Sequence, residues 1–196
     1  YPGVDLAAKW YGIIDAARSH YRGPLTYSAA AGDRDYIAPD GVEFWDALDY
    51  IGFEWYVPIT DRRDITITEL VQLARDFIEE KAKPLHEEYG KPILMTEVGF
   101  EAKPYAWTRS YEGSGQESPF DRLAAAVCYE YLFQAIEDYE YIEGMFIWSW
   151  QPANHEPGNT DIFPWDMWWS ITNDGNQVQH TIVLPQIARW FHYYSG

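Results

Sequence analysis

Short apolar segments alternate with longer amphipathic segments along this chain, and that alternation constrains the fold more than any other feature. Four apolar segments have the length and the flanking turn residues of strands: residues 25–30, 50–57, 93–98 and 144–150. Strands that alternate with helices pair through βαβ units into a parallel sheet. The sequence therefore predicts an α/β fold.

Helical periodicity occupies the stretches between these strands. Predicted helices cover residues 4–21, 41–47, 66–89, 118–139 and 184–194. Pro84 lies inside the third of them, where a residue without a backbone N–H should kink or divide the helix. Four strands with their helices are half of an eight-stranded (β/α) barrel, and the 196 residues fall short of the roughly 250 that such a barrel needs.

The charge of the chain excludes two classes of partner. Basic side chains number 14 and acidic ones 31, which gives a net charge of −17. Such a surface repels phosphate backbones and anionic lipid head groups, so we expect neither nucleic acid nor a membrane as a partner. No apolar run approaches the roughly 18 residues that cross a bilayer. The compartment is left open, with a slight preference for secretion.

Cysteine usage and motifs narrow the possible chemistry. Cys128 is the single cysteine, which excludes an intrachain disulfide framework and a multi-cysteine metal site. The sequence contains no phosphate loop, dinucleotide-binding fingerprint or nucleophile elbow. Aromatic residues, with 10 Trp, 16 Tyr and 9 Phe, make up 18% of the chain. Most of them should fill the core, and the remainder can stack on the faces of sugar rings.

Side chains alternate between the two faces of a strand, so each predicted strand has a core face and an opposite face. In residues 50–57 the face suited to packing under helices carries Ile51, Phe53, Trp55 and Val57. The opposite face carries Tyr50, Gly52, Glu54 and Tyr56.

The other two strands end in residues of chemical interest. In residues 93–98, strict alternation puts Glu97 on the face of Ile93 and Met95, at the carboxyl end of the strand. In residues 144–150, one face is aromatic and carries Phe146, Trp148 and Trp150.

If the polar and aromatic faces turn into a barrel, four side chains meet at its carboxyl-terminal mouth: Glu54, Tyr56, Glu97 and Trp150. Barrel enzymes keep their active sites at that mouth. Glu97 is the most informative, because a glutamate that ends an apolar strand is costly to bury without a partner. Strand context alone leaves two alternatives for it: a catalytic carboxylate, or one held in a salt bridge or a helix cap. Glu54 has the same ambiguity, with more weight on a supporting role.

Three segments resemble strands of glycoside hydrolase family 113, the β-mannanase-like barrels of clan A. LDYIGFEWYVP at 48–58 is similar to the sixth strand of that family, KPILMTEVGF at 91–100 to the seventh and GMFIWSW at 144–150 to the eighth. Their spacing also fits, and the resemblance runs from about Pro24 to the carboxyl terminus. It implies a (β/α)8 TIM barrel of which this chain resembles strands five to eight. Residues 1–196 would then be a single fragment of a catalytic domain.

The resemblance also implies an activity, retaining hydrolysis of a β-linked polysaccharide, with β-mannan as the family-based substrate. Glu97 corresponds to the glutamate that acts as nucleophile, and Tyr56 would orient it. Trp150 corresponds to the tryptophan that forms the floor of the sugar site. The further substrate contacts would be Trp148, Glu54 and Trp107. The implied reaction needs carbohydrate as its partner and no metal or organic cofactor.

Two departures from the family pattern matter. Clan A enzymes place the acid/base glutamate after an asparagine at the end of the fourth strand, and no Asn-Glu pair occurs in this chain. We therefore expect that residue in a missing amino-terminal half-barrel or a closing partner chain, and the fragment alone to be inactive. Trp55 stands where the family often has a small residue, and we expect it to reshape the sugar site. The alternative function is a non-catalytic carbohydrate-binding or structural half-barrel.

Overall fold

Four parallel strands form the central sheet of this chain. The computed structural model describes residues 5–30, 39–100, 103–108, 121–148, 151–152, 162–163 and 183–195. The strands of the sheet are β1 (Ser28–Ala30), β2 (Ile51–Trp55), β3 (Ile93–Val98) and β4 (Ile142–Ile147). The α-helices are α1 (Leu6–His20), α2 (Ile67–Phe77), α3 (Lys83–Tyr89), α4 (Arg122–Ile136) and α6 (Val183–Ser195).

The order of the strands in the sheet follows their order in the chain. The sheet reads β1-β2-β3-β4, and all three pairs of neighbours are parallel. Helices connect β2 to β3 and β3 to β4, as the alternation of the sequence predicts. Consecutive parallel strands with helical crossovers are the repeating unit of a (β/α) barrel.

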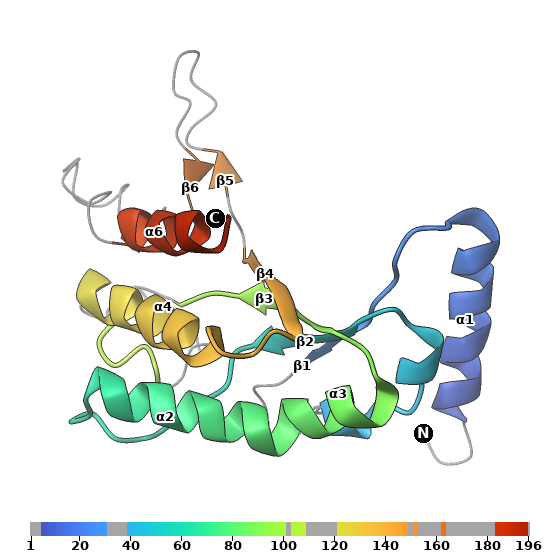
Figure 1. Cartoon of the computed structure of the whole chain (residues 1–196), viewed down its shortest axis with the longest axis horizontal. Coiled ribbons are helices and arrows are strands. Elements are labelled where there is room, and N and C mark those ends of the chain that lie inside the picture. Colours follow the sequence, from blue (N-terminus) through green and yellow to red (C-terminus); the bar gives the residue numbers. More distant parts are fainter. Residues whose placement is uncertain are drawn as a thin grey trace.

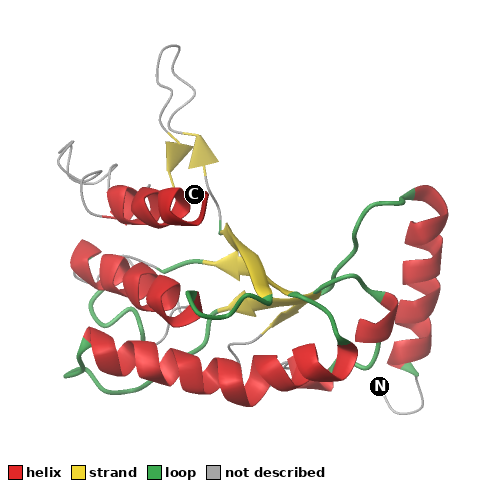
Figure 2. Cartoon of the chain, viewed as in Figure 1, coloured by secondary structure: helices red, strands yellow, loops and turns green. Residues whose placement is uncertain are grey.

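Helices α2 and α4 cover one face of the sheet, and α6 lies beyond α4 (Figures 1 and 2). The ring of Trp55 on β2 meets Phe77 of α2 edge to face, with centroids 5.4 Å apart. Six side chains of β2 and β3 are fully buried beneath the helices: Ile51, Phe53, Trp55, Ile93, Met95 and Val98. The core face predicted for the strand at 50–57 is confirmed.

The helix predicted at 66–89 is divided near Pro84, as expected. α2 passes through a π-helical turn, η3 (Ile78–Ala82), into α3, whose second residue is Pro84. Proline has no N–H to give to the preceding turn, and the wider π turn lets the chain continue in nearly the same direction. Gly90 then ends α3 with a φ of 64°, in the left-handed region where a residue without Cβ is favoured.

The prediction of a short helix at 41–47 is wrong. Two 3-10 turns stand there instead, η1 (Pro39–Gly41) and η2 (Trp45–Ala47). The ammonium group of Lys91, at the amino end of β3, donates to three backbone carbonyls, those of Trp45 at 2.7 Å, Asp46 at 2.6 Å and Leu48. A cation bound to the last carbonyls of a turn stabilises its end, so this segment needs no further helical hydrogen bonds.

The ends of the elements differ from the prediction by a few residues. β1 covers only the last three residues of the strand predicted at 25–30. β4 begins two residues before the predicted strand at 144–150. An antiparallel pair, β5 (Gln151–Pro152) with β6 (Ile162–Phe163), is absent from the prediction because strands of two residues carry no detectable period.

α1 lies at the opposite end of the sheet from α6 (Figure 1). Its Arg18 reaches the carboxylate of Asp49, with Nη2 2.5 Å from Oδ2, and the same oxygen accepts the N–H of Leu25 at 2.6 Å. The hydrogen bonds from Arg18 and Leu25 lower the pKa of Asp49. Because Leu25 precedes β1 and Asp49 precedes β2, this contact fixes α1 at the amino ends of both strands.

Candidate active site

The sheet face opposite α2 and α4 carries the predicted polar and aromatic side chains. Across this face, Ser28 of β1 forms hydrogen bonds with both Glu54 of β2 and Thr96 of β3. Phe146 of β4 is 61% exposed, and Trp148 just after it is 46% exposed. Large aromatic side chains left in solvent show that this face is open in the part of the chain that the structure describes.

A β-bulge decides which way Glu97 points. Met95 of β3 pairs with Phe53 of β2, and the next pair is Glu97 with Glu54. Thr96 is therefore an extra residue on β3. The prediction from strict alternation, which puts Glu97 on the same face as Met95, is wrong. Met95 is fully buried under the helices, whereas Glu97 is half-buried on the open face with Glu54.

Glu97 has one oriented donor and one charged neighbour. Tyr56 Oη donates a hydrogen bond to Glu97 Oε2 at 3.2 Å. Burial raises the pKa of Glu97, the negative charge of Glu54 raises it further, and the hydrogen bond from Tyr56 opposes both. The net direction is upward, so Glu97 ionises at a higher pH than an ordinary glutamate.

A pair of hydroxyl groups holds Glu54. Ser28 Oγ lies 3.3 Å from Glu54 Oε1 and 2.5 Å from Thr96 Oγ1. A carboxylate only accepts hydrogen bonds, so Ser28 donates to Glu54 and Thr96 donates to Ser28. The sequence analysis missed both hydroxyl residues. The available signal was their place, since each is a small hydroxyl residue within a short strand segment that is otherwise largely apolar.

The predicted aromatic contacts lie in different places. Trp148 lies at the carboxyl end of β4, where its backbone N–H donates to the carbonyl of Val98 at the end of β3, at 2.8 Å. Trp107 is half-buried, and its indole N–H donates to the carbonyl of Arg62 at 2.9 Å, so this donor already has a partner within the chain. Trp150 lies outside the described residues.

Trp55 does not reshape the open face, and that expectation is wrong. Its side chain is fully buried on the helix side of β2, edge to face with Phe77 of α2. Its indole N–H lies 3.4 Å from the hydroxyl of Tyr131 on α4. Trp55 alternates with Glu54 and Tyr56, so a large side chain here enlarges the core and leaves the open face unchanged.

A half-buried carboxylate with an oriented hydroxyl can act as a nucleophile or as a general base. The residues that could take part alongside Glu97 are those that face it, Tyr56 and Glu54. Among the described residues, no group of three or more His, Cys, Asp or Glu side chains is arranged to hold a metal ion. None of the described helices is long and apolar enough to cross a membrane.

Comparisons with known proteins identify a family and a fold. A family model described as Glycoside Hydrolase Family 113 matches residues 4–161. The solved complex of a family 113 β-1,4-mannanase aligns with a TM-score of 0.59 and 25% identity, over 74% of this chain and 40% of its own. A family 113 β-mannanase from Alicyclobacillus acidocaldarius aligns with a TM-score of 0.63 and 23% identity, over 92% of this chain and 50% of its own.

More distant structures share the same barrel. A β-glucuronidase from Ruminococcus gnavus aligns with a TM-score of 0.52 and 17% identity, over 79% of this chain and 25% of its own. No curated protein matches the chain. The chain spans half or less of the length of these solved enzymes. The predicted fold, a part of a (β/α)8 barrel, is confirmed.

Proposed function

The chain belongs to glycoside hydrolase family 113, and on that premise we propose that it supplies the nucleophile-bearing half of a retaining enzyme that hydrolyses β-mannan. The observation that carries the proposal is the placement of Glu97. The bulge turns it onto the open face at the carboxyl end of a parallel strand, and Tyr56 holds its carboxylate there. The substrate follows from the solved relatives, which are described as β-1,4-mannanases.

The reaction has two steps, each centred on the anomeric carbon. In the first, an oxygen of the Glu97 carboxylate attacks this carbon while its bond to the glycosidic oxygen breaks. A second carboxyl group protonates the departing oxygen. In the second step that group, now a carboxylate, takes a proton from water, the water oxygen attacks the same carbon, and Glu97 departs. Two inversions retain the configuration.

The neighbours of Glu97 have separate tasks in this scheme. Tyr56 orients the attacking carboxylate and stabilises its charge through the 3.2 Å hydrogen bond. Glu54, fixed by Ser28, accepts a hydrogen bond from a sugar hydroxyl. Trp148 offers an exposed indole surface on which a sugar ring stacks.

The acid/base residue lies outside this chain in our proposal. Attack and departure take place on opposite sides of the anomeric carbon, so the acid must face Glu97 across the cleft. Glu54 stands on the strand next to Glu97, on the same side of that cleft. The acid therefore comes from whatever closes the open face, an amino-terminal half-barrel or a partner chain. Without it, the 196-residue chain should be inactive.

Covalent trapping tests the role of Glu97. A polypeptide that contains both barrel halves is incubated with a fluorinated mannoside that forms a slowly hydrolysed glycosyl-enzyme, and is then digested. Mass spectrometry should find one sugar on the peptide that contains Glu97. Glu97→Gln should carry none, and the matched variant Glu54→Gln should still be labelled.

Four results would contradict the proposal. Labelling at another carboxylate would assign the nucleophile elsewhere, and an inverted product would exclude the double displacement. Binding of mannan by the complete polypeptide without any hydrolysis would favour the non-catalytic carbohydrate-binding half-barrel. Hydrolysis by the 196-residue chain alone would place the acid within it, with Glu54 the nearest candidate.

A further inference from the structure

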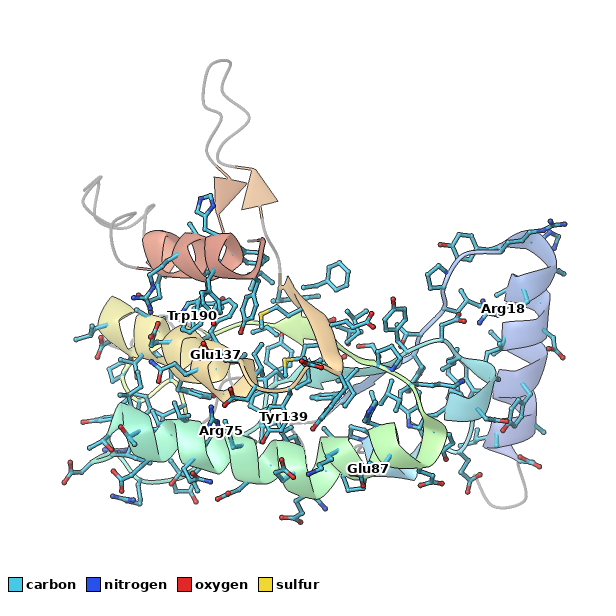
Figure 3. All side chains as sticks on the ribbon, viewed as in Figure 1. Arg18, Arg75, Glu87, Glu137, Tyr139 and Trp190 are labelled. Atoms are coloured by element: carbon cyan, nitrogen blue, oxygen red, sulfur yellow. The ribbon has the colours of Figure 1, made fainter. Side chains whose placement is uncertain are left out.

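A cavity of about 590 Å³ lies between α2, α4 and α6, and we call it the outer groove. The side chains that line it include Arg75 of α2, Glu130 of α4, Glu137 directly after α4, and Trp190 and Tyr193 of α6. Figure 3 shows three of the labelled residues, Arg75, Glu137 and Trp190, at the meeting of these helices. We propose that the outer groove binds a β-linked oligosaccharide, separately from the active site.

The outer groove lies apart from the open face of the sheet. The side chains of α4 that face the sheet are apolar and fully buried, such as Cys128 and Leu132. The acidic residues that line the groove, Glu130 and Glu137, are seven positions apart and so lie on one face of the helix, away from those two. A ligand in the groove would therefore be separated from Glu97 by α4 and the sheet.

The charges that line the outer groove balance. Arg75 and Arg189 stand against Glu130 and Glu137, in a chain whose net charge is −17. Arg189 Nη2 lies 2.7 Å from Glu130 Oε2, and Arg75 Nη2 lies 2.8 Å from the carboxylate of Asp138. Both guanidinium groups already have carboxylate partners, so neither is free to bind an anion, and the remaining carboxylate, Glu137, accepts a hydrogen bond from the hydroxyl of Tyr193. A neutral ligand fits it.

A preformed network of hydrogen bonds lines the floor of the outer groove. Glu130 accepts from the amide of Gln134 at 2.6 Å, from Arg189 at 2.7 Å and from the indole N–H of Trp190 at 2.8 Å. Burial acts to raise the pKa of Glu130, but these donors outweigh it and lower that pKa. The network is thus charged and fixed before any ligand arrives, as the polar part of a binding site must be.

One polar atom in this region has a free bonding position. Arg75 Nε is buried and has no hydrogen-bond partner among the described residues, although Nη2 of the same side chain donates to the carbonyl of Gln134 at 3.0 Å. A buried donor without an acceptor is costly, so a shift of the Arg75 side chain that brings Nε to a bound hydroxyl group would relieve that cost. A hydroxyl group, which accepts and donates at once, can satisfy Nε and a neighbouring carboxylate oxygen together.

An aromatic ring stands at the rim. Tyr193 is 59% exposed, and its ring meets that of Trp190 edge to face at 5.5 Å. Its hydroxyl donates to Glu137 Oε1 at 2.7 Å, which fixes the ring in place. A fixed exposed ring beside hydrogen-bonding groups suits a ligand with an apolar face and a hydroxylated edge. A sugar ring has both, and 590 Å³ is within the range of ligand cavities, about 300–1,000 Å³.

The neutral, hydroxylated character of the ligand follows from the groove, whereas its β-1,4-mannose linkage rests on the proposed function. The probe is therefore β-1,4-mannohexaose, with cellohexaose for comparison of the linkage and sugar. The chain carries Glu97→Gln throughout, so that no variant can degrade the probe. The indole N–H resonance of Trp190, assigned with Trp190→Phe, reports directly on the groove during the titration.

We expect mannohexaose to shift the Trp190 resonance and Tyr193→Ala to weaken that binding about tenfold, as loss of an aromatic contact does. Tyr193→Phe keeps the ring and should stay within about threefold of the parent. Phe191→Ala is the matched control, because Phe191 is 48% exposed on the same helix and lies outside the groove lining. It should bind like the parent.

An unshifted Trp190 resonance at every sugar concentration would overturn the inference. So would a Tyr193→Ala variant that binds like the parent, or a Phe191→Ala variant that is weakened equally. Tighter binding of cellohexaose than of mannohexaose would support a sugar site in the outer groove and refute its assignment to β-1,4-linked mannose. Failure of the trapping experiment at Glu97 would leave the Trp190 signal unaffected, so the two proposals fail separately.

Discussion

Removal of one hydroxyl group, in Tyr56→Phe, tests how Tyr56 controls Glu97, the nucleophile of our proposal. The hydrogen bond from Tyr56 Oη to Glu97 Oε2 is 3.2 Å long, which is at the weak end for an O–H donor and a carboxylate. It is also only partly buried. We therefore assign it about 1–1.5 kcal/mol, which is at or just below the lower limit for bonds to charged groups. At a pH where Glu97 is fully ionised, loss of the orientation that this bond gives to the attacking oxygen corresponds to a loss of about five- to tenfold in kcat/KM.

The pH profile of the same variant should change in a defined direction. The hydrogen bond from Tyr56 lowers the pKa of Glu97, so its loss raises that pKa and moves the acid limb of kcat/KM to higher pH. Glu54→Gln should move the limb to lower pH, because the charge of Glu54 raises the pKa of Glu97. Opposite shifts from two neighbours of one carboxylate would be hard to obtain from a general loss of structure.

The assay is kcat/KM against pH for the enzyme with both barrel halves. Tyr50→Phe is the matched control, since Tyr50 lies at the amino end of the same strand segment and its hydroxyl bonds to Glu143. That variant should keep the parent profile. An acid limb that stays in place or moves to lower pH in Tyr56→Phe would refute the reasoning, as would an undiminished plateau.

Two further predictions concern stability. Lys91→Met should lower the free energy of unfolding by about 2–4 kcal/mol in urea titrations, because three backbone carbonyls lose their shared donor. The control is Lys81→Met, because the ammonium group of Lys81 pairs with the adjacent Glu80 on the surface. A loss in Lys91→Met no larger than that in the control would contradict the prediction. Glu97→Gln should raise Tm by about 1–3 °C at neutral pH, since the raised pKa means that the fold disfavours the ionised carboxylate. The gain should vanish below the ordinary pKa of glutamate, where Glu97 is protonated in both states, and grow as pH rises; the opposite trend would refute it.

The parts of the fold that the sequence predicts correctly depend on neighbours in the chain. The core face of 50–57 follows from alternation alone, because packing under helices requires apolar residues at every second position. The division of 66–89 follows from the missing N–H of Pro84, and its end from Gly90. The proximity of Tyr56 and Glu97 is predictable because parallel strands bring their carboxyl ends to one edge of the sheet.

The parts that the sequence does not predict depend on contacts between distant segments. Whether Thr96 counts as a regular strand residue or as the extra residue of a bulge is decided by the pairing of β3 with β2. The hydrogen bond from Ser28 to Glu54 joins residues 26 positions apart. The outer groove needs three helices that meet only in the folded chain. The hydrophobic periodicity within one segment carries no information about contacts between segments that are distant in the sequence.

At Thr96, regular strand alternation would place Glu97 under the helices, whereas the proposed function needs Glu97 on the open face. Without the extra residue, Glu97 would face the helices with Met95, in a region where an unpaired carboxylate cannot be ionised. On the open face Glu97 is half-buried beside Glu54. The burial and the charge of Glu54 both raise the pKa of Glu97, and a more basic carboxylate is a stronger nucleophile toward the anomeric carbon. Tyr56 opposes that rise and so favours the ionised form of the carboxylate, the form that attacks in our proposal. In that proposal, insertion of one residue converts a core position into the nucleophile, and the two side chains that face it set the balance between reactivity and ionisation.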